Sequence, residues 1–323
     1  MDAVSSLLDG PRARRAFLLQ VVMEPPFSIR VEDEAPLSLI TAHGPMVLVD
    51  VDTGLTVSLA AGDVALTRGP DHYLIADDPG TEVQIVVRPG QVCRPPDGVE
   101  VKVADVLGTR TWGSGVDGGV AMIVGTYERA GEVSRRLLEA LPALAVVRSG
   151  PAIQPLVDLL ASEIVRDEPG QEAVLDRLLD LLLVTSVRTW FAGPEADTPA
   201  WYRANDDPVV GHALRLLHQE PEAPWTVATL AREVGVSRAT LARRFAEEVG
   251  ETPMAYLTEW RLALAADLLR EPDATVAGVA RQVGYGTGFA LSAAFSRVRG
   301  VSPSEHRALV PTDERLEAVA SRP

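Results

Sequence analysis

The feature that most constrains the fold is a pattern that occurs twice near the end of the chain. Residues 230–250 read LAREVGVSRATLARRFAEEVG, and residues 279–300 read VARQVGYGTGFALSAAFSRVRG. Each copy predicts a short helix, a glycine turn and a second helix, whose apolar face in the first copy is formed by Leu241, Phe245 and Val249. In the first copy the opposite face carries no large apolar side chain and is free to contact something other than the core. This pattern is typical of a helix-turn-helix, whose second helix lies in a DNA major groove.

The two copies carry the same residue at a series of equivalent positions, with one insertion in the second turn. The matched positions are Ala231, Arg232, Val234, Gly235, Leu241, Phe245, Gly250 and Pro253 in the first copy, and Ala280, Arg281, Val283, Gly284, Leu291, Phe295, Gly300 and Pro303 in the second. With the ending FSRVRGVSPSEHR at 295–307, this arrangement resembles the AraC family of bacterial transcription regulators. The resemblance covers roughly 208–309, about a third of the chain.

A long helix is predicted between the two copies. Thr252 is expected to cap it, Pro253 suits its first position, and it should run to Glu271 before Pro272 stops it. Its nineteen residues would span roughly 28 Å. Successive major grooves on one face of B-DNA lie about 34 Å apart. A rigid spacer of this length would set the two reading helices in neighbouring grooves.

The family resemblance implies which residues contact DNA. Arg243 is the one long donor on the first reading face; it could contact guanine in bidentate fashion, bind phosphate or remain a solvated surface side chain. Ala293 stands at its position in the second copy, so that helix is expected to hold the backbone, or to touch thymine methyls through Phe289, more than it reads bases. Trp260, Arg261 and Tyr285 are expected to pack. The DNA-binding candidates are Ser237, Arg238, Ala239, Thr240, Ala242, Arg243, Thr287, Gly288, Phe289, Ser292, Ala293 and Arg297.

Charge is distributed unevenly. The chain carries a net charge of −15, but residues 208–310 hold 11 basic and 11 acidic side chains, whereas residues 1–207 hold 17 and 31. The candidate DNA-binding part is therefore neutral and has no basic patch. We expect modest non-specific affinity for DNA, with phosphate contacts from a few arginines and from helix N-termini.

The first 130 residues are predicted to be β. Short segments rich in Val, Leu and Ile, at 46–52, 55–59, 63–68 and 83–87, are separated by Gly and Pro turns. The run LAAGDVALTRGPDHYLIADD at 59–78 resembles the second half of a cupin motif, which implies a small jelly-roll barrel with an internal pocket. Cupin enzymes hold a metal with a His-x-His pair, which this stretch lacks. We therefore expect no metal, no cofactor and no catalytic residue.

Four residues remain as ligand-binding candidates. His43, His72 and Cys93 could converge as a metal or redox site, although separate packed or exposed residues are the favoured interpretation. A reactive Cys93 would need a lowered thiol pKa, to which nearby arginines could contribute. Trp112 follows Arg110 in a Gly-rich loop, which could line a pocket, although ordinary packing is favoured.

The remaining segments define the domain organisation. Helices are predicted at 133–141, 155–166 and 171–191, and the last is apolar around much of its circumference. Either the barrel or a second copy must cover Leu175, Leu178, Leu179, Leu182, Val187 and Trp190. The expected domains are a cupin-like sensor at 1–130, a helical dimerisation segment at 131–192, a linker at 193–206, a double helix-turn-helix at 207–310 and a disordered tail at 311–323.

These observations predict an α+β multidomain chain that acts as a sequence-specific DNA-binding transcription regulator. Its expected partners are double-stranded promoter or operator DNA, a small-molecule effector, a second copy in a homodimer and RNA polymerase. The chain has no run of about 18 apolar residues and no apolar signal core, so a cytoplasmic location without membrane contact is expected. The alternatives are a cupin-type enzyme with accessory helices and a ligand-free structural dimer.

Overall fold

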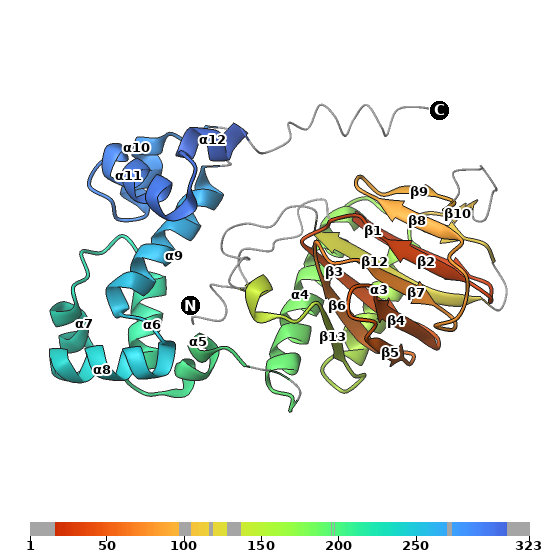
Figure 1. Ribbon diagram of the computed structural model, residues 1–323, viewed down its shortest axis with the longest axis horizontal. Coiled ribbons are helices and arrows are strands. Elements are labelled where there is room, and N and C mark those ends of the chain that lie inside the picture. The colour runs from red at the N-terminus through yellow and green to blue at the C-terminus, as the bar shows by residue number, and fades with distance from the viewer. Residues whose placement is uncertain are drawn as a thin grey trace. The chain divides into compact units, whose positions relative to one another are not determined.

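The computed structural model describes residues 17–96, 105–115, 119–127, 137–194, 196, 198–269 and 273–308 (Figure 1). The described residues form two compact units, one up to Thr198 and one from Pro199 onward. The first unit is mainly β and the second is all-helical, which confirms the predicted α+β arrangement. The predicted tail at 311–323 lies outside the described residues.

Two β-sheets build the first unit (Figure 1). The seven-stranded sheet has the order β10 (Asp105–Gly108), β11 (Thr111–Gly113), β1 (Phe17–Met23), β12 (Val120–Tyr127), β3 (Leu37–Ala42), β6 (Val64–Arg68) and β13 (Leu144–Val147). The six-stranded sheet has the order β5 (Thr56–Leu59), β4 (Met46–Asp50), β7 (Tyr73–Ala76), β2 (Ser28–Val31), β8 (Ile85–Arg88) and β9 (Val92–Arg94).

One apolar core joins the two sheets. Strand β4 alternates buried and less buried side chains, because successive side chains point to opposite faces, whereas β3 is buried on both faces. Residues of both sheets meet in this core, among them Met23, Ile40 and Met122 from one and Ile29 and Leu48 from the other. Two facing sheets of this kind are the form expected of a jelly roll. The four predicted strand segments are confirmed as β4, β5, β6 and β8.

The predicted helical segment at 131–192 contains a strand. Strand β13 pairs antiparallel with β6 at the edge of the larger sheet. Two helices follow as predicted, α3 (Gln154–Ile164) and α4 (Gln171–Phe191). In the helix predicted at 133–141, positions 133–136 lie outside the described residues and 137–140 are helical.

Helix α4 packs against the larger sheet. A Cβ atom added to Gly125 of β12 would lie 2.5 Å from Cδ1 of Leu179, so glycine is what allows this close approach. Leu175, Leu178, Leu179, Leu182 and Val187 are buried and Trp190 is half-buried within the chain itself. A second copy is therefore not needed to cover them. Val174 and Leu181 of the same helix remain 45% and 50% exposed.

The second unit holds two helix-turn-helix motifs. Its helices are α5 (Ala200–Arg203), the 3-10 turn η1 (Ala204–Asp206), α6 (Val210–Gln219), α7 (Val227–Glu233), α8 (Arg238–Val249), α9 (Pro253–Leu268), α10 (Val276–Gln282), α11 (Gly288–Arg299) and α12 (Pro303–Ala308). Gly235 turns the chain between α7 and α8 with a φ of +73°, a conformation that L side chains rarely adopt. Gly284 repeats this turn between α10 and α11.

Helix α9 belongs to both motifs (Figure 1). Tyr256 and Leu257 lie in the core formed with α6, α7 and α8, whereas Leu262 and Ala266 lie in the core formed with α10 and α11. The hydroxyl of Thr252 accepts from the Ala255 N–H, which confirms the predicted cap. A helix anchored in two cores is a rigid connection.

Two boundaries differ from the prediction. Helix α9 ends at Leu268, so its sixteen residues span about 24 Å rather than 28 Å, and Glu271 lies outside the described residues. The predicted linker contains α5 and η1, whose Trp201 and Ala204 pack into the first helical core. Its prolines and acidic residues suggested an irregular segment. The packing of Trp201 and Ala204 depends on residues distant in sequence, so the segment alone does not indicate it.

Candidate functional site: two reading helices and a cavity

Helix α8 presents the first candidate reading face. The Ser237 hydroxyl accepts from the Thr240 N–H, so the helix begins where its cap predicts. Leu241 and Phe245 are fully buried on the inner face. Of the predicted DNA-contacting residues here, Ser237, Arg238, Ala239 and Arg243 are exposed, and Thr240 and Ala242 are half-buried.

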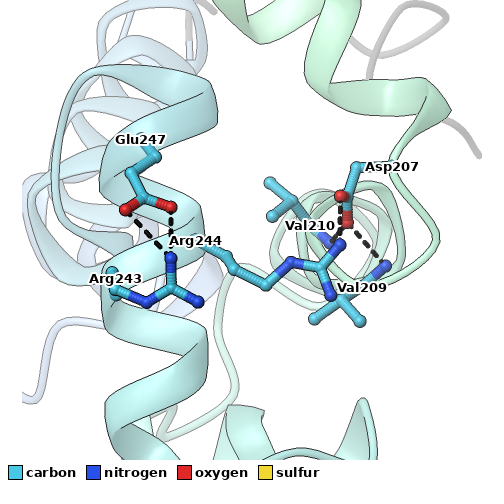
Figure 2. A network of polar contacts seen from close by, with 6 residues as sticks. All are labelled: Asp207, Val209, Val210, Arg243, Arg244 and Glu247. Carbon is cyan, nitrogen blue, oxygen red and sulfur yellow. Dashed lines mark hydrogen bonds and ion pairs between the residues drawn. The ribbon is translucent and has the colours of Figure 1, made fainter.

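Arg243 has an acidic neighbour one turn along the helix. Its Nη1 lies 2.8 Å and 3.0 Å from the two carboxylate oxygens of Glu247 (Figure 2). Both side chains are more than half exposed. Only Nη1 is engaged in this pair, so the Nε and Nη2 donors of Arg243 remain available for a second partner. This acidic neighbour was missed in the sequence, although its i,i+4 spacing is a local signal.

The next residue, Arg244, anchors the same helix. It pairs with Asp207, which also accepts from the N–H groups of Val209 and Val210 at 2.8 Å and so caps α6 (Figure 2). Partial burial raises the pKa of Asp207, but these backbone N–H groups and Arg244 outweigh it and hold the pKa below its usual value. Asp207 thus caps α6 and also fixes α8 against it.

Helix α11 presents the second candidate face. The Thr287 hydroxyl accepts from the Ala290 N–H, and Leu291 and Phe295 are fully buried. Phe289 is 85% exposed, which is unusual for so large an apolar side chain. Thr287, Ala293 and Arg297 are exposed, whereas Gly288 and Ser292 are half-buried.

The three residues expected to pack do so. Trp260 is 2% exposed and stacks on His218. Arg261 donates to the carbonyls of Pro221 and Ala223 at 2.6 Å and 2.7 Å, which ties α9 to the loop after α6. Tyr285 packs against the second helical core.

A cavity of about 420 Å³ lies between the two sheets of the first unit. Its walls are mostly apolar and come from β1 and β12 on one side and from β2, β7 and β8 on the other. Its polar side chains include Asp33, Gln91, Cys93, Arg110 and Thr111. A volume of this order suits a small organic molecule, since such sites span roughly 300–1,000 Å³.

Two of the four ligand candidates line this cavity. Cys93 and Trp112 contribute to its wall, but His43 and His72 do not. Nε2 of His43 lies 3.0 Å from Thr41 Oγ1, and burial lowers the pKa of the His43 imidazole. No group of three or more His, Cys, Asp or Glu side chains among the described residues could hold a metal ion. The convergence of His43, His72 and Cys93 is therefore not supported.

The structure bears on two other features. A reactive Cys93 is not supported, because desolvation raises the pKa of its thiol, whereas a reactive thiolate requires a lowered pKa. Arg110 in the turn before β11, and Thr111 and Trp112 in β11, line the cavity, and Trp112 also packs against the apolar core, as preferred. Asp33, Tyr73 and Gln91 were missed, because nothing local in the sequence indicates that they face one space.

Comparisons with known proteins agree with this architecture. A family model described as Cupin matches residues 2–192, and one described as a helix-turn-helix domain matches residues 230–308. A putative AraC-like transcription regulator of Streptomyces lividans is 34% identical over 255 residues, which cover 78% of this chain and 79% of that protein. The HTH-type transcriptional regulator AlkR of Acinetobacter baylyi is 36% identical over 177 residues, which cover 53% of this chain and 58% of AlkR.

One solved structure is also similar in sequence to the helical unit. It is the DNA-binding domain of AdpA, a global transcriptional factor, in complex with a target DNA. The identity is 34%, the match covers 32% of this chain and 92% of that chain, and the TM-score is 0.30. None of the described helices of this chain is long and apolar enough to span a bilayer.

Proposed function

The chain belongs to the AraC-like transcription regulators and carries a cupin domain, and from this premise we propose that α8 and α11 read two neighbouring major grooves of an operator. The observation that carries the proposal is the pairing of a buried inner face with an exposed outer face on both helices. Helix α9 joins them rigidly, because it contributes to the cores of both motifs.

The two helices have different roles in this proposal. Helix α8 contacts base edges with Arg243, which offers a guanidinium for bidentate contact with guanine, while Arg238 and Thr240 hold phosphates. Helix α11 touches thymine methyls with Phe289, and its remaining contacts, from Thr287 and Arg297, go to the backbone. Ala239, Ala242, Gly288, Ser292 and Ala293 are small and allow close approach, and Ser237 offers its helix N-terminus to a phosphate.

The test is a DNA-binding assay at several salt concentrations with Arg243→Ala. We expect specific affinity to fall by roughly 1–3 kcal/mol and base preference to relax at one position. Arg232→Ala removes the same charge from α7, where the side chain is 75% exposed, and should weaken binding to all sequences alike. Unchanged base preference in Arg243→Ala would reject Arg243 as a base contact.

The cavity between the sheets supports control of DNA binding by a small molecule. An effector there would favour one placement of the DNA-binding units over another, which is a population shift. The open volume speaks against a ligand-free structural dimer. The names of the relatives speak against a cupin enzyme, and metal-dependent turnover by the purified protein would restore that alternative.

We also propose a homodimer formed through α3 and α4. Leu159 and Val165, in and just after α3, are 48% and 50% exposed, and Val174 and Leu181 of α4 are similarly uncovered. Such exposed apolar side chains favour a protein partner, and a dimer suits paired operator sites. RNA polymerase remains a candidate partner to which no residue is assigned, and the cytoplasm is the proposed location because the protein must reach DNA.

A further inference from the structure

Arg110 contributes to the wall of the cavity. It is the one cationic residue, and Asp33 the one anionic residue, among the described residues that line it. Arg110 donates from Nη1 to the side-chain oxygen of Gln171, which is a neutral amide. Within the described part of the chain no carboxylate forms an ion pair with Arg110. Its positive charge therefore has no anionic partner among the residues that the structure describes.

Asp33 does not supply that partner. One of its oxygens accepts from the Ala35 N–H and the other from Gln91 Nε2, each at 3.1 Å. Both contacts come from the loops that follow β2 and β8, in the smaller sheet. Arg110 sits in the turn between β10 and β11, in the larger sheet. One wall of the cavity thus carries a carboxylate with hydrogen-bond donors on its own side, and the other carries an arginine without a carboxylate partner among the described residues.

The backbone next to the cavity is strained at three places. Glu34, Gln91 and Arg110 have φ values of +57°, +59° and +47°, and they are the non-glycine residues with positive φ in the described part of the chain. Gln91 and Arg110 line the cavity, and Glu34 follows Asp33. Strain of this kind clusters where a ligand is held. An arginine at a position that suits glycine indicates that the side chain itself is needed there.

We propose that the cavity binds an apolar monocarboxylate, whose carboxylate is held by N–H groups of Arg110 other than the one bonded to Gln171. A guanidinium has five N–H donors, so Arg110 can keep Nη1 on Gln171 and hold a carboxylate in bidentate fashion with others. The apolar body of the ligand would lie among Leu19, Ile29, Ile75 and Trp112. This assignment rests on the proposed function, because it names the chemical class of the effector.

Gln171 acts as a positioning residue for Arg110. It is 5% exposed and is the first residue of α4. Its Nε2 donates to the carbonyl of Glu163 in α3 at 2.7 Å and to the carbonyl of Arg166. Arg110, which would hold the ligand's carboxylate, is therefore connected through the side-chain amide of Gln171 to the junction of α3 and α4, the helices proposed for dimerisation. Occupancy of the cavity would be transmitted through that junction.

The test compares acids with their neutral amides on the full-length chain. Calorimetric titration with decanoate and decanamide, and with 2-naphthylacetate and its amide, measures how strongly the wild type and each variant prefer the acid over the amide. We expect the wild type to bind at least one acid about tenfold more tightly than its amide, since charge-assisted hydrogen bonds are the stronger kind. Arg110→Met should bring this ratio to about one, Arg110→Lys should leave an intermediate ratio, and Gln171→Met should lower it without changing the affinity for the amide.

Arg88→Met is the matched control. Arg88 is 60% exposed on β8, and its side chain is not part of the cavity wall. It should leave the acid-to-amide ratio unchanged. Equal binding of acid and amide by the wild type, a preference that survives in Arg110→Met, or no binding of either acid would each overturn the proposal.

Specific DNA binding by the same preparations separates this inference from the proposed function. Intact DNA recognition without acid binding would reject only the carboxylate site. Acid binding that depends on Arg110 but leaves DNA affinity unchanged would support the site and reject effector control. If the wild type binds neither specific DNA nor either acid, the two proposals are rejected together.

Discussion

At the scale of single residues, Glu247 modifies what Arg243 can do. The carboxylate holds Nη1 of Arg243 and places a negative charge beside the reading face. We predict that Glu247→Gln raises non-specific DNA affinity about two- to fivefold, because an exposed ion pair is worth roughly 0.2–1 kcal/mol. The ratio of specific to non-specific affinity should fall accordingly. Glu248→Gln removes the same charge from the next position. Equal effects of the two variants in a salt-dependent binding assay would contradict a role for the pair.

Asp63 has a structural role at the Gly-Asp turn of the cupin-like motif. Its carboxylate accepts from the N–H groups of Ala60 and Ser149 and pairs with Arg148, which fastens the turn before β6 to the end of β13. Burial raises the pKa of Asp63, but these three contacts outweigh it and hold the pKa below the usual 3.8. The ionised form therefore stabilises the fold above that pH, and the stabilisation is lost as the pH falls through the lowered pKa.

The prediction concerns Asp63→Asn. We expect it to lower the free energy of unfolding by about 1–3 kcal/mol at pH 7, the range for hydrogen bonds to a charged group, and by less as the pH falls below 3.8. Urea unfolding of the full chain at pH 7 and at a pH below 3.8 measures the two differences in the free energy of unfolding. The exposed Asp52→Asn serves as control and should change little. A loss that does not depend on pH would contradict the assignment to the ionised carboxylate.

At the scale of elements, the pair of Arg244 with Asp207 holds the reading helix in place. Arg244→Met removes a partner from a partly buried carboxylate, so we predict a lower melting temperature and a loss of about 1–3 kcal/mol in the free energy of unfolding. DNA affinity should fall alike for all sequences, because Arg244 positions α8 without contacting bases. Arg244→Lys should recover part of both losses. A changed base preference in Arg244→Met would show instead that Arg244 reads DNA.

The exposed stripe of α4 carries the dimer proposal. Val174 and Leu181 lie seven residues apart and so share one helix face. We predict that Leu181→Glu shifts the protein from dimer to monomer in sedimentation velocity experiments. Ala173→Glu, an exposed change on a different face, should leave the dimer intact. A wild-type protein that sediments as a monomer at all concentrations would reject the proposal.

The elements also show what could be predicted from sequence. Thr252 and Pro253 set the start of α9 through chemistry that acts within one turn, so this start was predicted correctly. Strand β13 was missed because LAVV, at positions 144–147, is too short to show a period and becomes a strand by pairing with β6, far away in sequence. The internal pocket was expected from the cupin resemblance, but its lining was not, since Phe17, Tyr73 and Val124 meet only in the folded sheets.

At the scale of the whole molecule, the chain combines a strongly acidic first part with a neutral DNA-binding part. Few cations are available for phosphates in residues 208–310, so affinity for non-specific DNA should be modest and recognition should depend on the two reading helices together. The rigid α9 fixes their separation, so the operator should contain two short motifs at a constant spacing.

The most direct test of this central claim is selection of bound sequences from random double-stranded DNA by the full-length protein. We predict two enriched motifs whose centres lie about one helical turn, or roughly 10 base pairs, apart. The motif read by α8 should contain a guanine whose enrichment disappears in Arg243→Ala. Enrichment of a single motif, of two motifs at variable spacing, or of none would contradict the proposal that the duplicated helix-turn-helix reads two neighbouring grooves.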